Sequence, residues 1–207
     1  MPEDELSPRA HRSRVALLEA AVTILESDDR APEITITDIV ALAGVSRPTF
    51  YKNFDNIPAL VREAALRRLT VAFDAIPDAA LGENWPDFAR GVFHGVLTEL
   101  VCHSRFYLGA LDLAETPISN DFVTFLSEHL LDRSPIGPVI RRRRGKDTPQ
   151  QRADFLAAGT VWHVRAWLRS PRATEDAIDA FVDEIAALLL SASGATDDEI
   201  ARAGLGG

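Results

Sequence analysis

The segment Ile34–Phe54, ITITDIVALAGVSRPTFYKNF, decides the fold because it predicts two short helices separated by a tight turn. Thr35, followed three residues later by Asp38, indicates the start of the first helix. Gly44 suits the left-handed backbone conformation that often ends a helix. Ser46, two residues further on, can cap the second helix with its hydroxyl. Together these signals predict a helix-turn-helix.

The second of these helices is expected to have one buried face. Phe50 and Phe54 lie four residues apart and therefore share one side of a helix. The side chains on its other sides could enter the major groove of DNA, and they are Arg47, Thr49, Tyr51 and Lys52. The pattern therefore favours a DNA-binding protein.

Helical periodicity continues along the rest of the chain, and no convincing alternating strand interrupts it. The helices expected outside the motif span 8–27, 56–75, 85–104, 105–114, 119–131, 148–169 and 174–193. Loops are expected at 28–33, 77–84 and 132–147, and fraying over the last dozen residues. The fold class is therefore all-α, with an N-terminal tail and helix-turn-helix at 1–55, a connecting helix at 56–76 and a larger helical domain at 77–207.

The composition is typical of a soluble globular protein, with 46% hydrophobic and 26% charged residues in 207. No apolar run reaches the roughly 18–20 residues that a membrane span needs. The acidic start of the chain does not resemble a signal peptide, and Cys102 is the single cysteine. We therefore expect a cytoplasmic protein without a disulfide or a membrane partner.

The formal net charge of −9 argues weakly against a nucleic-acid partner, but the acidic residues are unevenly placed. Residues 1–68 contain 9 Lys and Arg against 11 Asp and Glu, whereas the remaining residues contain 13 against 20. Residues 7–18 include three arginines and a histidine and no acid. A local basic surface is therefore available in the N-terminal part.

Residues 9–62 resemble the DNA-binding domain of the TetR family of transcriptional regulators. The matching positions are Thr35, Asp38, Ile39, Ala43, Gly44, Val45, Ser46, Thr49, Phe50, Tyr51, Phe54 and Leu60. The C-terminal part is similar to these regulators in size and all-helical pattern. The resemblance implies a DNA-binding regulator without catalytic activity or cofactor. Repression relieved by a small effector is the expected mode, and activation stays open.

The resemblance also implies which side chains contact double-stranded operator DNA, namely Thr35, Thr37, Ser46, Arg47, Pro48, Thr49, Tyr51 and Lys52. Arg47 could bind guanine through two hydrogen bonds, whereas Tyr51 and Lys52 would contact phosphates. Thr37 and Ile57 stand where basic residues are common in the family. Fewer phosphate contacts and a smaller salt dependence are therefore expected.

The larger helical domain is expected, from the same resemblance, to bind a small, largely apolar effector and to form a homodimer. The expected ligand-binding side chains are Phe88, Val92, Phe106, Tyr107, Leu111, Phe122, Phe125 and Trp162, with Tyr107, His94 and His163 as polar anchors. The same aromatic groups would also suit an ordinary core. The expected dimer contacts come from the last two helices, at Ala158, Val161, Trp162, Arg165, Phe181, Ile185 and Leu188.

Other kinds of site have weaker support. No metal site is expected, because the candidate ligands fall on different faces of one helix, and they are His94, Glu99, Cys102 and His103. The basic run Arg141–Arg144 with Lys146 could bind DNA or an acidic partner but is more typical of a solvated loop. No phosphate-binding loop or GxSxG elbow indicates catalysis. The alternative to a regulator is a helical ligand carrier or enzyme that retains an unused helix-turn-helix.

Overall fold

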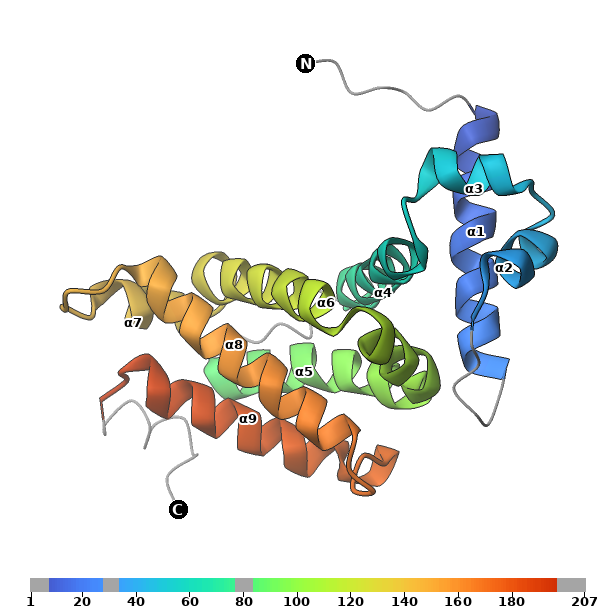
Figure 1. Ribbon diagram of the computed structural model, residues 1–207. Helices are drawn as coiled ribbons and strands as arrows, with labels where there is room; N and C mark the ends of the chain where they lie inside the picture. The colour runs from blue at the N-terminus through green and yellow to red at the C-terminus, as the bar shows by residue number, and fades with distance from the viewer. Residues whose placement is uncertain (1–7, 28–33, 77–83, 197–207) are drawn as a thin grey trace. The chain divides into compact units, whose positions relative to one another are not determined.

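The computed structural model describes residues 8–27, 34–76 and 84–196, and these residues form helices joined by turns, with no β-strand among them. The predicted all-α fold class is confirmed (Figure 1). The chain divides into two compact units, one made of 1–68 with 105–118 and the other of 69–104 with 119–207. None of the described helices has the length and apolar character needed to cross a membrane.

The N-terminal unit contains both predicted helices of the motif and a longer helix before them. α1 spans Pro8–Ser27, α2 spans Ile36–Ala43 and α3 spans Arg47–Asn53. α4 spans Ile57–Asp74, and its residues up to Arg68 belong to this unit. α1 packs against both α2 and α3. The core of the unit is built from buried apolar side chains that include Leu17, Leu18, Ile39, Phe50, Leu60 and Val61.

A segment from much further along the chain completes this unit. It is the stretch 105–118, which forms the first part of helix α6 (Ser104–Asp132). Phe106 in this stretch is fully buried. A Cβ placed on Gly109 would lie 3.1 Å from Cδ2 of Leu25 on α1. The missing side chain at Gly109 therefore allows α6 to approach α1 closely.

The C-terminal unit is built from the remaining helices. α5 spans Trp85–Cys102, α7 spans Gly137–Arg142, α8 spans Pro149–Leu168 and α9 spans Ile178–Ser193. α9 packs along α5 and also contacts α8 (Figure 1). The second part of α6 also belongs to this unit.

Polar contacts join α9 to α5, and an aromatic contact joins it to α8. The indole Nε1 of Trp85 donates to the carbonyl oxygen of Ala186 at 2.8 Å. Arg90 Nη2 lies 3.0 Å from Asp183 Oδ1. The order of these residues shows that α5 and α9 run antiparallel. On the other side, the rings of Trp167 and Phe181 stack with their centroids 4.4 Å apart.

The prediction of separate helices at 105–114 and 119–131 is confirmed in part, because α6 consists of two helical stretches that meet at a kink. The predicted break survives as a distortion at Ala114, whose φ of −147° and ψ of 42° are not helical. Pro117 follows three residues later inside the helix. Proline has no N–H to donate and its ring crowds the preceding turn, so it distorts this helix without ending it.

The predicted loop 132–147 was also partly wrong, because it contains α7. Val139 and Ile140 of this short helix are buried, as is Ile136 just before it. Burial of these side chains stabilises a helix too short to be stable alone. The predicted helix at 174–193 begins instead with a 3-10 turn at Glu175–Ala177, and α9 follows. The predicted loop 28–33, residues 77–83 of the predicted loop 77–84 and the fraying terminus lie outside the described residues, whereas Asn84 caps α5.

Candidate nucleic-acid interface and a pocket in the helical unit

The turn between α2 and α3 has the geometry that its sequence predicts. Gly44 has φ 64° and ψ 31°, which is the left-handed conformation. Ser46 Oγ accepts a hydrogen bond from the backbone N–H of Thr49 at 3.3 Å. Thr35 Oγ1 accepts one from the backbone N–H of Asp38 at 3.2 Å. Both short helices therefore begin at side-chain caps, and the predicted helix-turn-helix is confirmed.

Most of the side chains predicted to contact DNA are open to solvent. Seven of the eight are exposed and Thr49 is half-buried. Tyr51 is 56% exposed, and its ring meets the buried Phe50 ring edge-on at 5.4 Å. Thr35 and Ser46 use their hydroxyl oxygens as helix caps. These two hydroxyls therefore place the helix ends, while the remaining side chains are available to a ligand.

Basic side chains are exposed on two helices of this unit. Arg47 and Lys52 are exposed on α3, and Arg9, His11 and Arg12 are exposed on α1. The sequence of α3 contains no acidic residue. Arginine and lysine are the main partners of DNA phosphates. The exposed charge of α3 is therefore positive although the chain as a whole is acidic.

The eight side chains predicted to bind a ligand are divided between the two units. The N-terminal unit holds three of them, all buried, at Phe106, Tyr107 and Leu111. The other five belong to the C-terminal unit and range from the buried Phe88 and Val92 through the half-buried Phe122 and Phe125 to Trp162, which is 61% exposed. Their role in ligand binding stays a prediction.

Phe125 belongs to a small aromatic cluster in the C-terminal unit. Its ring centroid lies 5.1 Å from that of Phe73 and 4.1 Å from that of His129. His129 Nδ1 also lies 2.7 Å from the carbonyl oxygen of Phe125. The Phe73 and Phe125 rings meet edge-on, which is a favourable arrangement for an aromatic pair, and all three residues are half-buried.

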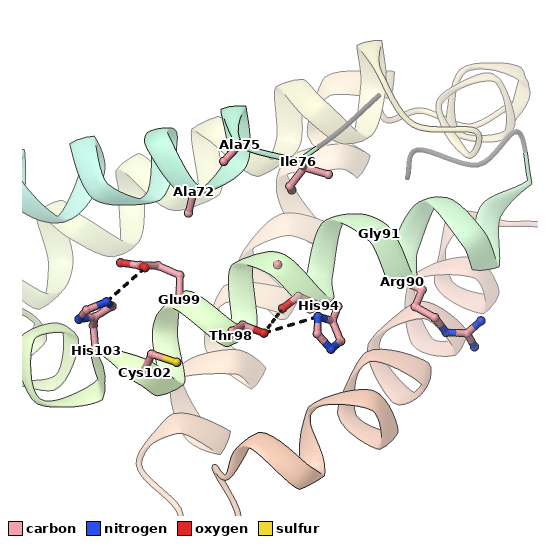
Figure 2. A pocket seen from close by; sticks show the side chains of 11 residues that line it. Ala72, Ala75, Ile76, Arg90, Gly91, His94, Thr98, Glu99, Cys102 and His103 are labelled. Carbon is pink, nitrogen blue, oxygen red and sulfur yellow. Dashed lines mark hydrogen bonds and ion pairs between the residues drawn. The ribbon is translucent and has the colours of Figure 1, made fainter. Parts of the chain in front are cut away.

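A pocket of about 610 Å³ lies in the C-terminal unit, between the end of α4 and one face of α5 (Figure 2). The α4 side is apolar and consists of Ala72 on the helix and of Ala75 and Ile76, the two residues after it. The α5 side consists of Arg90, Gly91, His94, Gly95, Thr98, Glu99, Cys102 and His103. A Cβ on Gly95 would lie 3.4 Å from Cγ1 of Ile76, so this glycine leaves room at the pocket wall.

None of the eight predicted ligand-binding residues lines this pocket, whereas His94, one of the three predicted polar anchors, does. Sequence reasoning looked for large aromatic groups, whereas the pocket is formed where side chains are small. The available signal was the pair Gly91 and Gly95, which lie four residues apart and therefore on one face of a helix.

Polar side chains of the pocket interact with neighbours at the end of α5 and in the 3-10 turn before α9. Figure 2 shows Glu99 directed toward His103, with 3.6 Å between the carboxylate and the ring nitrogen. The thiol of Cys102 donates to the carboxylate of Glu175 at 3.7 Å. Partial desolvation and the adjacent negative charge of Glu175 raise the pKa of Cys102 above its ordinary value. The thiol therefore stays protonated at neutral pH.

The side chains predicted to form a dimer interface differ in exposure. Phe181 and Ile185 are buried within the protomer, and Val161 and Arg165 are half-buried. The exposed members are Ala158, Trp162 and Leu188. Phe155, which the prediction missed, is 80% exposed and lies one turn before Ala158 on α8. We call Phe155, Ala158, Trp162 and Leu188 the α8–α9 apolar surface.

Two other candidates from the sequence can be placed. Within the described ranges, no three His, Cys, Asp or Glu side chains lie together in a way that could hold a metal ion. The basic run Arg141–Arg144 and Lys146 are exposed at the end of α7 and in the turn after it. Arg141 Nη2 lies 2.5 Å from Asp132 Oδ1, so part of this charge is paired.

The architecture is thus an all-helical one in which a capped helix-turn-helix belongs to one unit and a larger helical unit carries a pocket. No protein-family model matches the chain, and no curated protein matches its sequence. Solved structures of similar fold include those of three transcriptional regulators.

The chain is similar to the Rhodococcus erythropolis transcriptional repressor QsdR of the TetR family, with 19% identity, coverage of 91% of this chain and 97% of that one, and a TM-score of 0.56. It is also similar to a candidate transcriptional regulator from Rhodococcus sp. RHA1, with 18% identity, 90% and 98% coverage and a TM-score of 0.55.

A third similar structure is that of NalD, the secondary repressor of the MexAB-OprM multidrug efflux pump in Pseudomonas aeruginosa. Here the identity is 19%, the coverage 92% and 98%, and the TM-score 0.50. The chain therefore has the fold of TetR-type regulators over nearly its whole length.

Proposed function

We propose that this protein is a transcriptional regulator that binds operator DNA through α3. The exposed face of this helix carries the proposal. Arg47, Tyr51 and Lys52 are exposed on it, its first turn is capped by Ser46, and it contains no acidic residue. A helix of this kind fits the major groove, where arginine can recognise guanine. The TetR-type fold supports the same role.

The first test is binding of the purified protein to DNA from upstream of its own coding region, measured at two salt concentrations against scrambled DNA. Tyr51→Ala and Lys52→Ala should each weaken operator binding. Loss of the Lys52 contact should also lower the slope of log affinity against log salt by about 1.

Arg172→Ala is the control for Lys52→Ala, because Arg172 is also an exposed basic residue but lies in the other unit and outside the basic run Arg141–Arg144. Its removal should leave operator binding nearly unchanged. Operator binding that survives the combined Tyr51→Ala and Lys52→Ala change would contradict the proposed contacts. Absence of any specific binding across the genome would favour the ligand carrier or enzyme.

The proposed regulator acts as a homodimer. One short recognition helix reads few base pairs, and two-fold pairing on a palindrome doubles the sequence that is read. The α8–α9 apolar surface supports this, because large apolar side chains such as Phe155 and Trp162 are left exposed in the protomer.

The finer proposal is that a small effector releases the protein from DNA by binding in the α4–α5 pocket. The apolar α4 side and the polar α5 side of this pocket would suit an effector with an apolar body and a few hydrogen-bonding groups. The predicted aromatic set, which includes Phe125, is the competing location.

The effector proposal is tested by screening apolar compounds for release of bound operator. Ala72→Trp would fill the pocket and should abolish release by an active compound while operator binding is retained. Val71→Trp is the control, because Val71 is 61% exposed and does not line the pocket. A compound that releases both variants equally would place the effector elsewhere.

A further inference from the structure

The side chain of Arg14 connects three helices of the N-terminal unit. It projects from α1, and its Nε donates to Glu63 Oε1 on α4 at 2.8 Å. Its Nη2 pairs with the other carboxylate oxygen of Glu63. Its Nη1 donates to the carbonyl oxygen of Asn53, the last residue of α3, at 2.8 Å. The guanidinium also lies over the Phe54 ring, 4.4 Å from its centroid.

These contacts match the chemistry of a guanidinium group. Its planar fork binds both oxygens of the Glu63 carboxylate, and another N–H remains for a third acceptor. The carbonyl of Asn53 is one of the last of α3, and such carbonyls have no partner within the helix. A positive charge at this end is also favourable for the helix dipole. A lysine could not make all of these contacts at once.

The recognition helix has few other means of holding its C-terminal end. α3 is seven residues long, and Phe50 is its buried residue. Its N-terminal end is capped by Ser46. At the other end, the Asn53 side chain donates back into α3, to the carbonyl oxygen of Thr49 at 2.7 Å. Phe54, which follows α3, is buried. Arg14 adds a polar link from this end of α3 to Glu63 on α4.

We propose that Arg14 is a positioning residue for DNA recognition, which fixes the end of α3 relative to Glu63 on α4. This inference rests on the proposed function. Arg14 acts through α3 and makes no base contact of its own. The orientation of the recognition helix in the groove, and hence the preference for operator over other DNA, depends on the intact Glu63–Arg14–Asn53 connection.

A second ion pair in the same unit supplies a matched control. Arg68 on α4 lies 3.1 Å from Glu26 on α1, so it also joins these two helices. The side chains of Arg68 and Glu26 are 23% and 35% exposed. These values are close to the 29% and 36% of Arg14 and Glu63. Glu26 lies twelve residues beyond Arg14, which is about 18 Å along the helix. Removing the Arg68–Glu26 ion pair therefore tests a general loss of stability in this unit and leaves the contacts at the end of α3 unchanged.

The experiment compares Arg14→Gln, Glu63→Gln and Glu26→Gln in the full chain, at a temperature where circular dichroism shows all of them folded. Arg14→Gln and Glu63→Gln should each weaken operator binding about tenfold and reduce the ratio of operator to nonspecific affinity. Glu26→Gln should change either quantity less than threefold. The double variant Arg14→Gln/Glu63→Gln should be no weaker than the single variants, because both remove one connection.

Glu63→Gln also separates positioning from direct phosphate contact. If Arg14 bound a phosphate, removing the negative charge of Glu63 would strengthen DNA binding or leave it unchanged, and that result would overturn the proposal. Arg14→Lys keeps the charge but not the fork, so positioning predicts that it binds operator nearly as weakly as Arg14→Gln. Full activity of Arg14→Lys would likewise contradict positioning.

Amide hydrogen exchange tests the inference without DNA. Exchange at Tyr51–Phe54 should be at least tenfold faster in Arg14→Gln and Glu63→Gln than in Glu26→Gln. Equal acceleration in all three variants would reduce Arg14 to a general stabiliser of the unit. A wild-type protein that binds no DNA would refute the proposed function, whereas the exchange rates would still decide whether Arg14 holds α3.

Discussion

At the scale of single residues, Cys102 shows how the 3-10 turn Glu175–Ala177 alters the chemistry at the end of α5. The thiol is exposed, yet it donates to Glu175 at 3.7 Å. Partial desolvation and this carboxylate both favour the neutral thiol, so its pKa is raised. Because the thiolate is the nucleophilic form, exposure alone does not make Cys102 reactive.

The expected result is slow alkylation of Cys102 by iodoacetamide at pH 8, with a rate that rises at higher pH than for a free cysteine. Glu175→Gln should shift this rate profile toward lower pH and increase the rate at pH 8, because the added negative charge is gone. Glu128→Gln, a change at another exposed acid of the same unit, is the control. If the alkylation rate of Cys102 depends on pH in the same way in Glu175→Gln as in the wild type, the Glu175 carboxylate does not act on the thiol.

At the scale of helices, the residues at which an element begins and ends are determined by caps and turns close by in the sequence. Whether a helix continues past a weak point is determined by the packing of its side chains. The turn between α2 and α3 depends on Gly44, which alone among its neighbours has a positive φ of 64°. An L-residue is strained in this conformation even where there is room for its side chain. At Gly44 a Cβ would meet no atom within 4 Å, so the cost of a side chain is one of backbone strain.

Gly44→Ala should therefore lower the free energy of unfolding by about 1 kcal/mol, measured by urea denaturation. Gly44→Asn should cost less, since asparagine adopts the left-handed conformation more readily. The slope of the transition with urea should be unchanged in both, because the surface exposed on unfolding is the same. An alanine variant as stable as the wild type would refute the assigned role of this glycine.

At the scale of the whole molecule, the α8–α9 apolar surface is the feature that points to a second copy. Along α8, Phe155, Ala158 and Trp162 follow the spacing of one helix face. By contrast, Phe181 and Ile185 are buried within the protomer, and substituting them would damage its core. Exposed residues are therefore the informative positions for testing the proposed dimer.

Trp162→Asp should convert the proposed dimer to a monomer in analytical ultracentrifugation while circular dichroism remains helical. A buried aspartate without a partner at the dimer contact would be strongly unfavourable. Val71→Asp is the control, since Val71 and Trp162 are both 61% exposed, and Val71 lies on α4. A Trp162→Asp variant that remains dimeric would require a different interface.

The helix-turn-helix could be predicted from sequence because its determinants are local. The caps at Thr35 and Ser46 and the turn at Gly44 each act within about four residues. The all-α class followed from periodicity in the same way. The exposed side chains of α3 were predicted as a group, because helical geometry assigns Phe50 to the buried face and leaves Tyr51 and Lys52 outside.

Packing between segments that are distant in the sequence determined the features that the sequence did not predict. The link from Arg14 to Glu63 joins residues 49 positions apart, and α7 is a helix because its apolar side chains are buried. The stretch 105–118 joins the N-terminal unit through the close approach at Gly109. The pocket depends on Ile76, just after α4, lying beside Gly95. Such contacts are set by how helices assemble in three dimensions, and local sequence carries no signal for their partners.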